Sequence, residues 1–347
     1  MLLIIGAFIL VSGCNTPKVT DELIAQMTET VQQQTIMAMP TEIIATETPQ
    51  PEPEKIVLVT LADANQGILD IFRDQLNMLL PEIFTIVEMS EMTPDQVPAD
   101  ANLIIFPDTP SDIADYSQQN PENSFAVISL EQQPYSNVWT IPYDPGFEPF
   151  FAGYFIGVTA NDWRGAGLLP SDSPLFGAQI EETFVNGMKY FCGRCQSYGP
   201  PYVEFPVTVM LPEGTDADGW IAGLDQVQSS LPNTFYISDA ALSQQLLDQM
   251  KERSAAVVTA SQPTEGWDGN WLGSVRINLG NALAEVIQRD AQHETAAVVI
   301  PELEIQSGVQ QALFSSGKMT YLENLYNDVL TGLVSVYDPV APEVFEP

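Results

Sequence analysis

The chain has 347 residues, of which 45% are hydrophobic, and its 46 acidic and 11 basic residues give a formal net charge of −35. This charge excludes nucleic acid as a partner, because phosphate contacts depend on lysine and arginine. It predicts a strongly hydrated acidic surface but says little about a ligand, because exposed charges are screened beyond about 10 Å in physiological salt. A cleft that is itself acidic and favours a cation stays open as an alternative.

A short apolar run occupies residues 2–11. It is too short for a membrane span, which needs about 20 residues, and is typical of the core of a signal peptide. The run ends in Val11-Ser12-Gly13-Cys14, which resembles the bacterial lipobox, although no Lys or Arg precedes it. The resemblance implies a signal peptide with lipobox over 1–14, a lipid on Cys14, and anchoring at the extracytoplasmic face of the cell membrane. A cysteine that follows the run by chance is the alternative.

Residues 15–54 are rich in Thr, Gln, Glu and Pro and carry a single basic residue, Lys18. Such a segment buries too little apolar surface to offset the entropy of ordering it, so we expect a disordered tether between the membrane and a folded domain. The alternative is a short helix over 21–37, one face of which would be apolar. Residues 339–347 are expected to form a tail.

From residue 55 onward, about 290 residues remain, which is more than a single core usually serves and favours two lobes. Strands and helices alternate in the first part of this stretch. Strands are expected at 55–61, 84–89, 102–107, 125–130 and 136–144, a helix at 67–80, and short helical or turn segments at 93–97 and 111–118. This alternation implies right-handed crossovers and a parallel sheet that is covered on both faces.

Three elements follow within residues 150–191. The first is an apolar helix, which we interpret as crossing between lobes, and its small residues Ala152, Gly153 and Gly157 would let another backbone approach closely. A buried strand at 165–169 and a polar turn at 170–174 precede a helix at 178–191. The turn lies at the carboxyl end of a strand, which is where ligands bind in open parallel sheets.

The remaining chain repeats the alternation of strands and helices. Strands are expected at 203–211, 234–238 and 255–261, with helices at 216–229 and 241–253 between them. A strand and helix at 272–287, a late strand at 296–305, and a final helix with a closing strand at 319–336 complete the pattern.

The run from Ala152-Gly-Tyr-Phe-Ile-Gly-Val to Phe184-Val-Asn-Gly-Met-Lys-Tyr resembles the start of the second lobe in type I periplasmic binding proteins. It is most similar to the basic membrane protein branch, typified by nucleoside-binding lipoproteins of ABC transporters. The resemblance implies an α/β fold with two Rossmann-like lobes, parallel sheets flanked by helices, and a three-pass hinge. The N-terminal lobe would hold 55–148 plus about 276–314, and the C-terminal lobe 149–275 plus about 315–338.

The resemblance also implies a function. A small solute would bind between the lobes, the lobes would close on it, and an ABC permease would receive it, with no cofactor, no catalytic residue and no enzymatic activity. Nucleoside-binding members carry an acid and a lysine in the region aligned with 261–278, where this chain has Ser261, Gln262 and Ile277, so nucleoside specificity does not follow. The alternatives are a surface sensor or interaction module without transport, and an extracellular carboxylate-dependent hydrolase.

Candidate ligand residues lie where strands end. Asn65 and Gln66 match the family's Asn-Gln pair and Asp63 stands near its acid, although an ordinary helix cap explains them equally well. Aspartates near other strand ends have the same two interpretations, and two aromatic residues would either stack on a planar ligand or pack in the core. These further candidates are Asp108, Asp172 and Asp239, with Tyr143 and Trp267.

Two cysteines remain if Cys14 is lipidated, Cys192 and Cys195 in a Cys-x-x-Cys pattern. They follow the carboxyl end of a predicted helix, where the helix dipole disfavours the thiolate that redox chemistry needs. A zinc site would need two more ligands, and His293, expected to be exposed, is far along the chain. We therefore expect a local disulfide and no metal.

Overall fold

In the computed structural model, the described residues are 54–61, 63–79, 84–264, 267–308 and 316–338. The chain divides into two compact units, Met1–Pro51 and Glu52–Pro347, and every described residue lies in the second. The signal peptide, Cys14, all but the last residue of the tether, and the tail lie outside the described residues, so these expectations stay predictions. No helix of the described part is long and apolar enough to cross a membrane.

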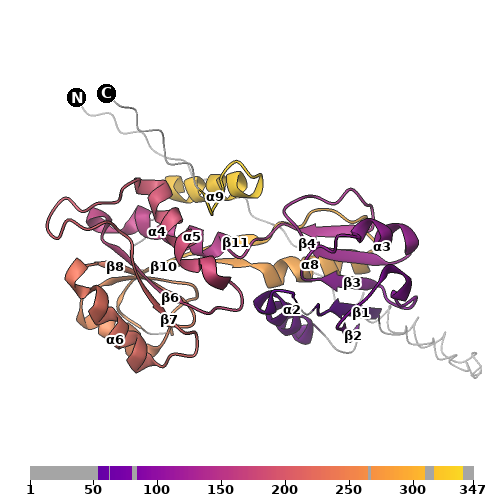
Figure 1. Cartoon of the computed structure of the whole chain (residues 1–347), viewed down its shortest axis with the longest axis horizontal. Helices are drawn as coiled ribbons and strands as arrows, with labels where there is room; N and C mark the ends of the chain where they lie inside the picture. Colours follow the sequence, from indigo (N-terminus) through magenta and orange to yellow (C-terminus); the bar gives the residue numbers. More distant parts are fainter. Residues whose placement is uncertain (1–53, 62, 80–83, 265–266, 309–315, 339–347) are drawn as a thin grey trace, which may run out of the picture. The chain divides into compact units, whose positions relative to one another are not determined.

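A first sheet has five parallel strands in the order β2-β1-β3-β4-β5 (Figure 1). They are β1 (Glu54–Val59), β2 (Phe84–Met89), β3 (Leu103–Phe106), β4 (Ser124–Ile128) and β5 (Val138–Ile141). Ile56 and Leu58 of β1 pack in the cluster that contains α2 (Gln66–Met78), whereas Val57 and Val59 pack in the cluster that contains α3 (Ile113–Gln119). Because alternate side chains of a strand face opposite ways, both faces of this sheet are covered.

A second sheet has the order β11-β10-β9-β8-β6-β7. Its strands are β6 (Gly165–Pro170), β7 (Val207–Leu211), β8 (Thr234–Ile237), β9 (Ala256–Thr259), β10 (Asn270–Asn278) and β11 (Glu302–Ser307). The first five are parallel and repeat, in chain order, the 2-1-3-4-5 arrangement of the first sheet, while β11 runs antiparallel to β10. The two sheets are therefore two copies of one Rossmann-like plan.

Helices also cover the second sheet on both faces. Residues of α6 (Ala217–Val227) and α7 (Gln244–Glu252) form a cluster on one face, and α4 (Phe147–Thr159) and α5 (Ile180–Cys192) belong to the main core on the other. Short 3-10 turns occur at Pro94–Gln96, Asn161–Trp163, Gly177–Gln179 and Gln228–Ser230. We call the first sheet with its helices the first lobe, and the second sheet with its helices the second lobe.

The chain passes between the lobes three times. The first passage, 142–146, joins β5 to α4, and the second joins β10 directly to α8 (Leu279–Ala291), which packs on α2 and β5 of the first lobe. Residues 296–299 then run beside β5, where the Val299 N–H donates to Thr140 O at 2.9 Å, before the third passage leads to β11. The expected three-pass hinge is confirmed.

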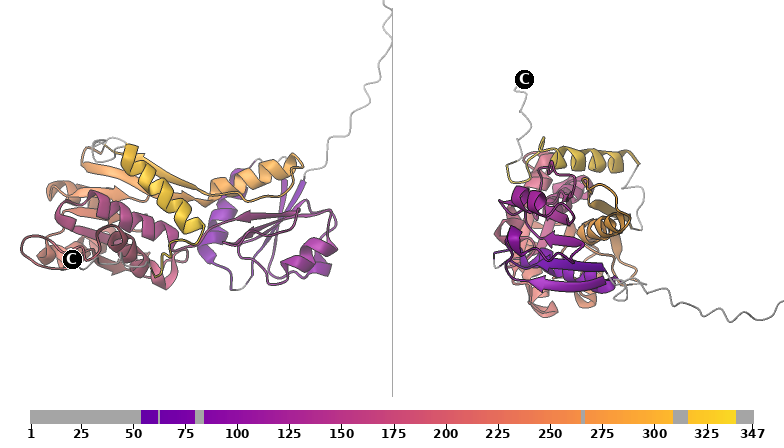
Figure 2. Two further views of the ribbon diagram at one scale, coloured as in Figure 1. Left: turned by 90° about the horizontal axis from the view of Figure 1, so that it is seen from above. Right: turned by 90° about the vertical axis from the view of Figure 1, so that its right-hand side faces the viewer.

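The last described helix, α9 (Ser316–Leu330), packs on the second lobe (Figure 2). The Tyr326 ring meets Phe151 of α4 edge-on at 5.5 Å, and its hydroxyl donates to Pro301 O at 2.7 Å. This helix thus joins α4 to the chain just before β11.

Three expectations need correction. Residues 302–307 pair with β10 and belong to the second lobe rather than the first, because Leu303 lies opposite Ile277 and Glu304 forms an ion pair with Arg276. No strand follows α9 within 331–338, which form turns. The helix expected to cross between lobes, α4, packs within the second lobe, and the loop before it makes the crossing.

Other expectations are confirmed. Cys192 and Cys195 form a disulfide at the end of α5, with a Cα–Cα distance of 5.1 Å, and His293 is exposed. The small residues of α4 do permit close approach: a Cβ at Gly153 would lie 1.9 Å from Phe184 O of α5. Reciprocally, a Cβ at Gly187 of α5 would lie 1.8 Å from Phe150 O.

Gly187→Ala tests this backbone contact. Replacing a helical glycine by alanine usually stabilises a helix by about 1 kcal/mol, but here the added methyl group overlaps a carbonyl of α4. We expect the free energy of unfolding, measured in urea, to fall by about 1–3 kcal/mol. Gly214→Ala is the control, because nothing lies within 4 Å of its added Cβ. A gain in stability for Gly187→Ala would contradict the packing.

Candidate functional site

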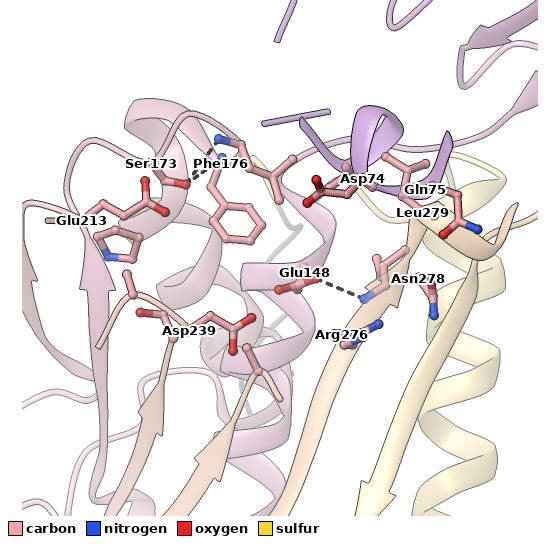
Figure 3. A pocket seen from close by; sticks show the side chains of 18 of the residues that line it. Asp74, Gln75, Glu148, Ser173, Phe176, Glu213, Asp239, Arg276, Asn278 and Leu279 are labelled. Atoms are coloured by element: carbon pink, nitrogen blue, oxygen red, sulfur yellow. Dashed lines mark hydrogen bonds between the residues drawn. The ribbon is translucent and has the colours of Figure 1, made fainter. Parts of the chain in front are cut away.

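A cavity of about 380 Å³ lies between the lobes (Figure 3). The first lobe contributes one face of α2 and the start of α8. The second lobe contributes the carboxyl ends of β6, β8, β9 and β10 and the start of α4. Its volume falls in the range of about 300–1,000 Å³ that is usual for small-molecule sites.

The topology explains why the cavity forms here. In the second sheet, β6 lies between β7 and β8, so the chain order reverses at β6. Loops that leave neighbouring strands at such a point turn to opposite faces of the sheet and leave a crevice at the carboxyl ends. Ser173, in the loop after β6, and Asp239, in the loop after β8, both line this crevice.

The charged residues of the lining are predominantly acidic. Asp74, Glu148, Glu213 and Asp239 supply four carboxylates, and Arg276 is the one cation among the lining residues that the structure describes. Arg276 Nε donates to Glu304 Oε2 at 2.9 Å, so much of its charge is already balanced outside the cavity. The cavity therefore carries an excess of negative charge.

Glu148 is the buried carboxylate of this set, with 8% of its surface exposed. It stands in the first turn of α4, and its Oε2 accepts the Ile277 N–H of β10 at 3.1 Å. Burial raises the pKa of Glu148 to about 7, the negative charge of Asp239 adds to this shift, and the Ile277 N–H and Arg276 oppose it. Glu148 thus joins α4 to the end of β10 at the wall of the cavity, beside the first and second passages of the hinge.

Ser238 precedes Asp239 at the end of β8 and is 3% exposed. The residue lines the cavity, and its buried Oγ has no hydrogen-bond partner among the described residues. A buried hydroxyl without a partner is costly, so a group bound in the cavity would gain by bonding to it.

The rim of the cavity holds direct contacts between the lobes. Asn65 Nδ2 donates to Leu175 O at 2.8 Å, and the Gly67 N–H donates to Pro174 O at 3.3 Å. A Cβ at Gly67 would lie 2.4 Å from the Leu175 Cα, so only glycine allows this approach. The amino terminus of α2 therefore closes against the loop after β6.

Of the eight residues predicted to bind ligand, all of which the structure describes, Asp239 lines this cavity. Asn65 caps α2, since its Oδ1 accepts the Ile68 N–H at 3.0 Å, and also forms the rim contact. Asp63 and Asp108 line a separate cavity of about 390 Å³ within the first lobe. The loop after β1 therefore serves the rim and a neighbouring cavity instead of the interlobe one.

The other four predicted residues make local contacts. Gln66 bonds within its own helix, and Asp172 accepts the Glu213 N–H at 2.6 Å. Tyr143 is buried in the main core, and Trp267 packs against the cluster beneath α6 and α7. Both aromatic residues therefore pack against hydrophobic clusters, which is the alternative to ligand stacking that the sequence left open.

The sequence prediction missed Glu148, Ser238 and Phe176, which line the cavity together. Glu148 had a visible signal, because it is a single carboxylate among the apolar residues of α4. Ser238 and Phe176 had none, because their placement depends on how neighbouring strands and loops are arranged.

No protein-family model and no curated protein matches the sequence significantly. Solved structures do resemble it. An ABC transporter solute-binding protein from Conexibacter woesei matches with a TM-score of 0.47 at 10% identity, over 81% of this chain and 98% of that chain. A LacI transcriptional regulator from Bacteroides fragilis matches with a TM-score of 0.45 at 9% identity, over 76% and 100%.

A carbohydrate transporter solute-binding protein from Agrobacterium radiobacter, in complex with D-arabinose, matches with a TM-score of 0.42 at 13% identity, over 79% of this chain and 99% of that chain. The fold of this chain consists of two sheets, each with five parallel strands in the same order, and three chain passages between them. This is the type I periplasmic-binding-protein architecture.

Glu148→Gln tests the buried carboxyl through the pH dependence of stability. Because the pKa of Glu148 is raised in the folded state, the unfolded chain releases this proton first, and the free energy of unfolding falls as pH rises from about 4.5 to about 7. Glutamine has no ionisable carboxyl group, so the variant does not lose stability in this pH range for this reason. We expect the variant to exceed the wild type by about 3 kcal/mol at pH 8 and by little at pH 4.5. Glu323→Gln, on an exposed position of α9, is the control for the lost charge, and equal curves for the two variants would contradict the assignment.

Proposed function

We propose that the protein is a solute-binding protein that captures a small molecule between its two lobes and delivers it to an ABC-type permease. The observation that supports this function best is a cavity of small-molecule size, lined from both lobes, where the first two passages of the hinge meet. Binding there is coupled to lobe closure by geometry, because a ligand that touches both lobes favours the conformation in which both are near.

The rim contacts support the closing motion. The contact between the start of α2 and the loop after β6 consists of two hydrogen bonds, from Asn65 and Gly67, and one close backbone approach. Contacts of this size are worth about 1 kcal/mol each, so they can break and re-form as the lobes move. A bound solute would add the differential affinity that keeps them formed.

We place this function outside the cytoplasmic membrane, with a lipid on Cys14 and residues 15–53 as the tether. The lipobox-like sequence supports the anchor, and the Cys192–Cys195 disulfide is consistent with an oxidising compartment. We propose binding rather than catalysis, with an ABC permease as the partner.

Thermal unfolding of the full chain carrying Cys14→Ser tests solute binding. Screening should include sugars, nucleosides, amino acids and polyamines, and a solute at 100 times its dissociation constant should stabilise the protein by about 2.7 kcal/mol. Gly67→Val should weaken that solute at least about tenfold, because its side chain would hold the rim apart. Gly214→Ala should bind normally. Absence of any stabilising solute would contradict the proposal.

Lipid attachment is tested separately with the unmodified chain in a bacterial host. We expect the wild type to incorporate radiolabelled palmitate and to sediment with membranes, and Cys14→Ser to do neither. Cys192→Ser with Cys195→Ser is the matched control, since it removes two cysteines and should leave labelling intact. Labelling that persists in Cys14→Ser would contradict the anchor.

One observation favours a second candidate, carboxylate-dependent hydrolysis. Glu148 and Asp239 line the same cavity, and the raised pKa of Glu148 would suit a general acid. Turnover distinguishes the two functions: a hydrolase releases product from a glycoside and loses this activity in Glu148→Gln, whereas a binding protein returns its solute unchanged.

A further inference from the structure

We propose that the solute captured by the interlobe cavity is an organic cation with a primary ammonium group, held by the carboxylates of Glu148 and Asp239 and by Ser238 Oγ. This inference rests on the solute-binding function proposed above and specifies its ligand.

The acceptors match the donors of an ammonium group. Figure 3 shows the carboxylates of Glu148 and Asp239 turned toward the same space, and Ser238 directly precedes Asp239 at the end of β8. A primary ammonium has three N–H donors and no acceptor. Two carboxylates and one hydroxyl oxygen supply three acceptors, and the hydroxyl is the buried one that lacks a partner in the described part of the chain.

The charge of the cavity selects a cation over a neutral or anionic solute. Four carboxylates line it against one guanidinium, and Arg276 is engaged by Glu304 at 2.9 Å. An anion would meet net repulsion. A sugar could bond to the same oxygens but would bring no positive charge to oppose the carboxylates, of which Glu148 is buried.

The same residues do not suit a metal ion. Among the described residues, no three carboxylate, histidine or cysteine side chains converge closely enough to ligate one. The cavity also has apolar walls, to which Leu175, Phe176 and Leu279 contribute. Apolar walls accommodate a hydrocarbon body, and an aromatic ring such as that of Phe176 attracts a cation placed over its face.

Two further acidic residues of the lining, Asp74 and Glu213, favour a second positive group on the same ligand. Asp74 reaches the cavity from α2 of the first lobe, and Glu213 reaches it from the loop after β7 of the second. Both are exposed, as Asp239 is, and they add negative charge to the cavity beyond that of Glu148 and Asp239. We therefore expect a diamine to bind more tightly than the monoamine of the same length.

Calorimetry on the full chain carrying Cys14→Ser tests the proposal. The probes are 1,4-diaminobutane, 1,5-diaminopentane, butylamine, calcium chloride, glucose and adenosine, each in 150 mM salt so that general attraction to the acidic surface is screened. We expect a diamine to bind with one-to-one stoichiometry. Asp239→Asn should weaken it about 10–100-fold, since a hydrogen bond to a charged group is lost. Asp248→Asn, an exposed aspartate of α7, makes the same charge change and should leave affinity intact.

Two readouts separate ligand contact from a structural role. Ser238→Ala should weaken amine binding while keeping or raising the stability of the free protein, because it removes a buried hydroxyl without a partner. Lowering the pH from 8 to 6 should weaken binding about tenfold as Glu148 gains a proton, and Glu148→Gln should bind weakly with little pH dependence. Asp239 raises the pKa of Glu148 and Arg276 lowers it, while the charge of Glu148 in turn raises the pKa values of Tyr143 and Tyr236.

The outcomes distinguish failure of the cation assignment from failure of the proposed solute-binding function. If glucose or adenosine binds, Asp239→Asn abolishes that binding, and the amines fail, the cation assignment is overturned while solute binding stands. If amines bind equally well to Asp239→Asn and Asp248→Asn, they bind the acidic surface and the assignment is also overturned. If no probe of either class binds, and no other solute stabilises the protein, the solute-binding function fails as well.

Discussion

The hydrogen bond from the Ile277 amide to the buried carboxylate of Glu148 joins β10 to α4 beside the first two passages between the lobes. Burying a carboxylate with one strong donor is expensive, and the raised pKa of Glu148 reflects that expense. An apolar residue there would pack into α4 at lower cost. The carboxylate instead places a titratable acidic group on the cavity wall beside the hinge.

The topology of the two sheets explains why the cavity lies next to the hinge. Each contains five parallel strands in the same order, so each has a carboxyl edge where loops diverge. Because β10 runs straight into α8, and β5 leads to α4 through a short loop, the lobes stay close near these passages. Close fits elsewhere keep the second lobe firm: Gly153 and Gly187 let α4 and α5 approach within backbone contact.

The sequence predicted the fold well, because apolar runs and helical spacing mark elements directly, and the expected positions of β2 (Phe84–Met89) and α2 agree with the structure closely. It placed 302–307 in the wrong lobe, since an antiparallel edge strand and a returning parallel strand have similar patterns. The residues that line the cavity were harder to predict from the sequence. Asp239 follows a strand and was predicted, whereas Ser238 and Phe176 reach the cavity through tertiary packing that no local pattern encodes. Asn65 was predicted as a ligand residue but caps a helix and holds the rim.

The distance between the lobes during binding is the most direct test of the account. Fluorescent labels at Glu122→Cys in the first lobe and Glu252→Cys in the second, both exposed positions, would report it by single-molecule energy transfer in a Cys14→Ser background. The account predicts that a solute bound in the cavity increases the population with the shorter distance, and that Asp239→Asn requires far more solute for the same change. One unchanging distance at saturating solute would contradict it.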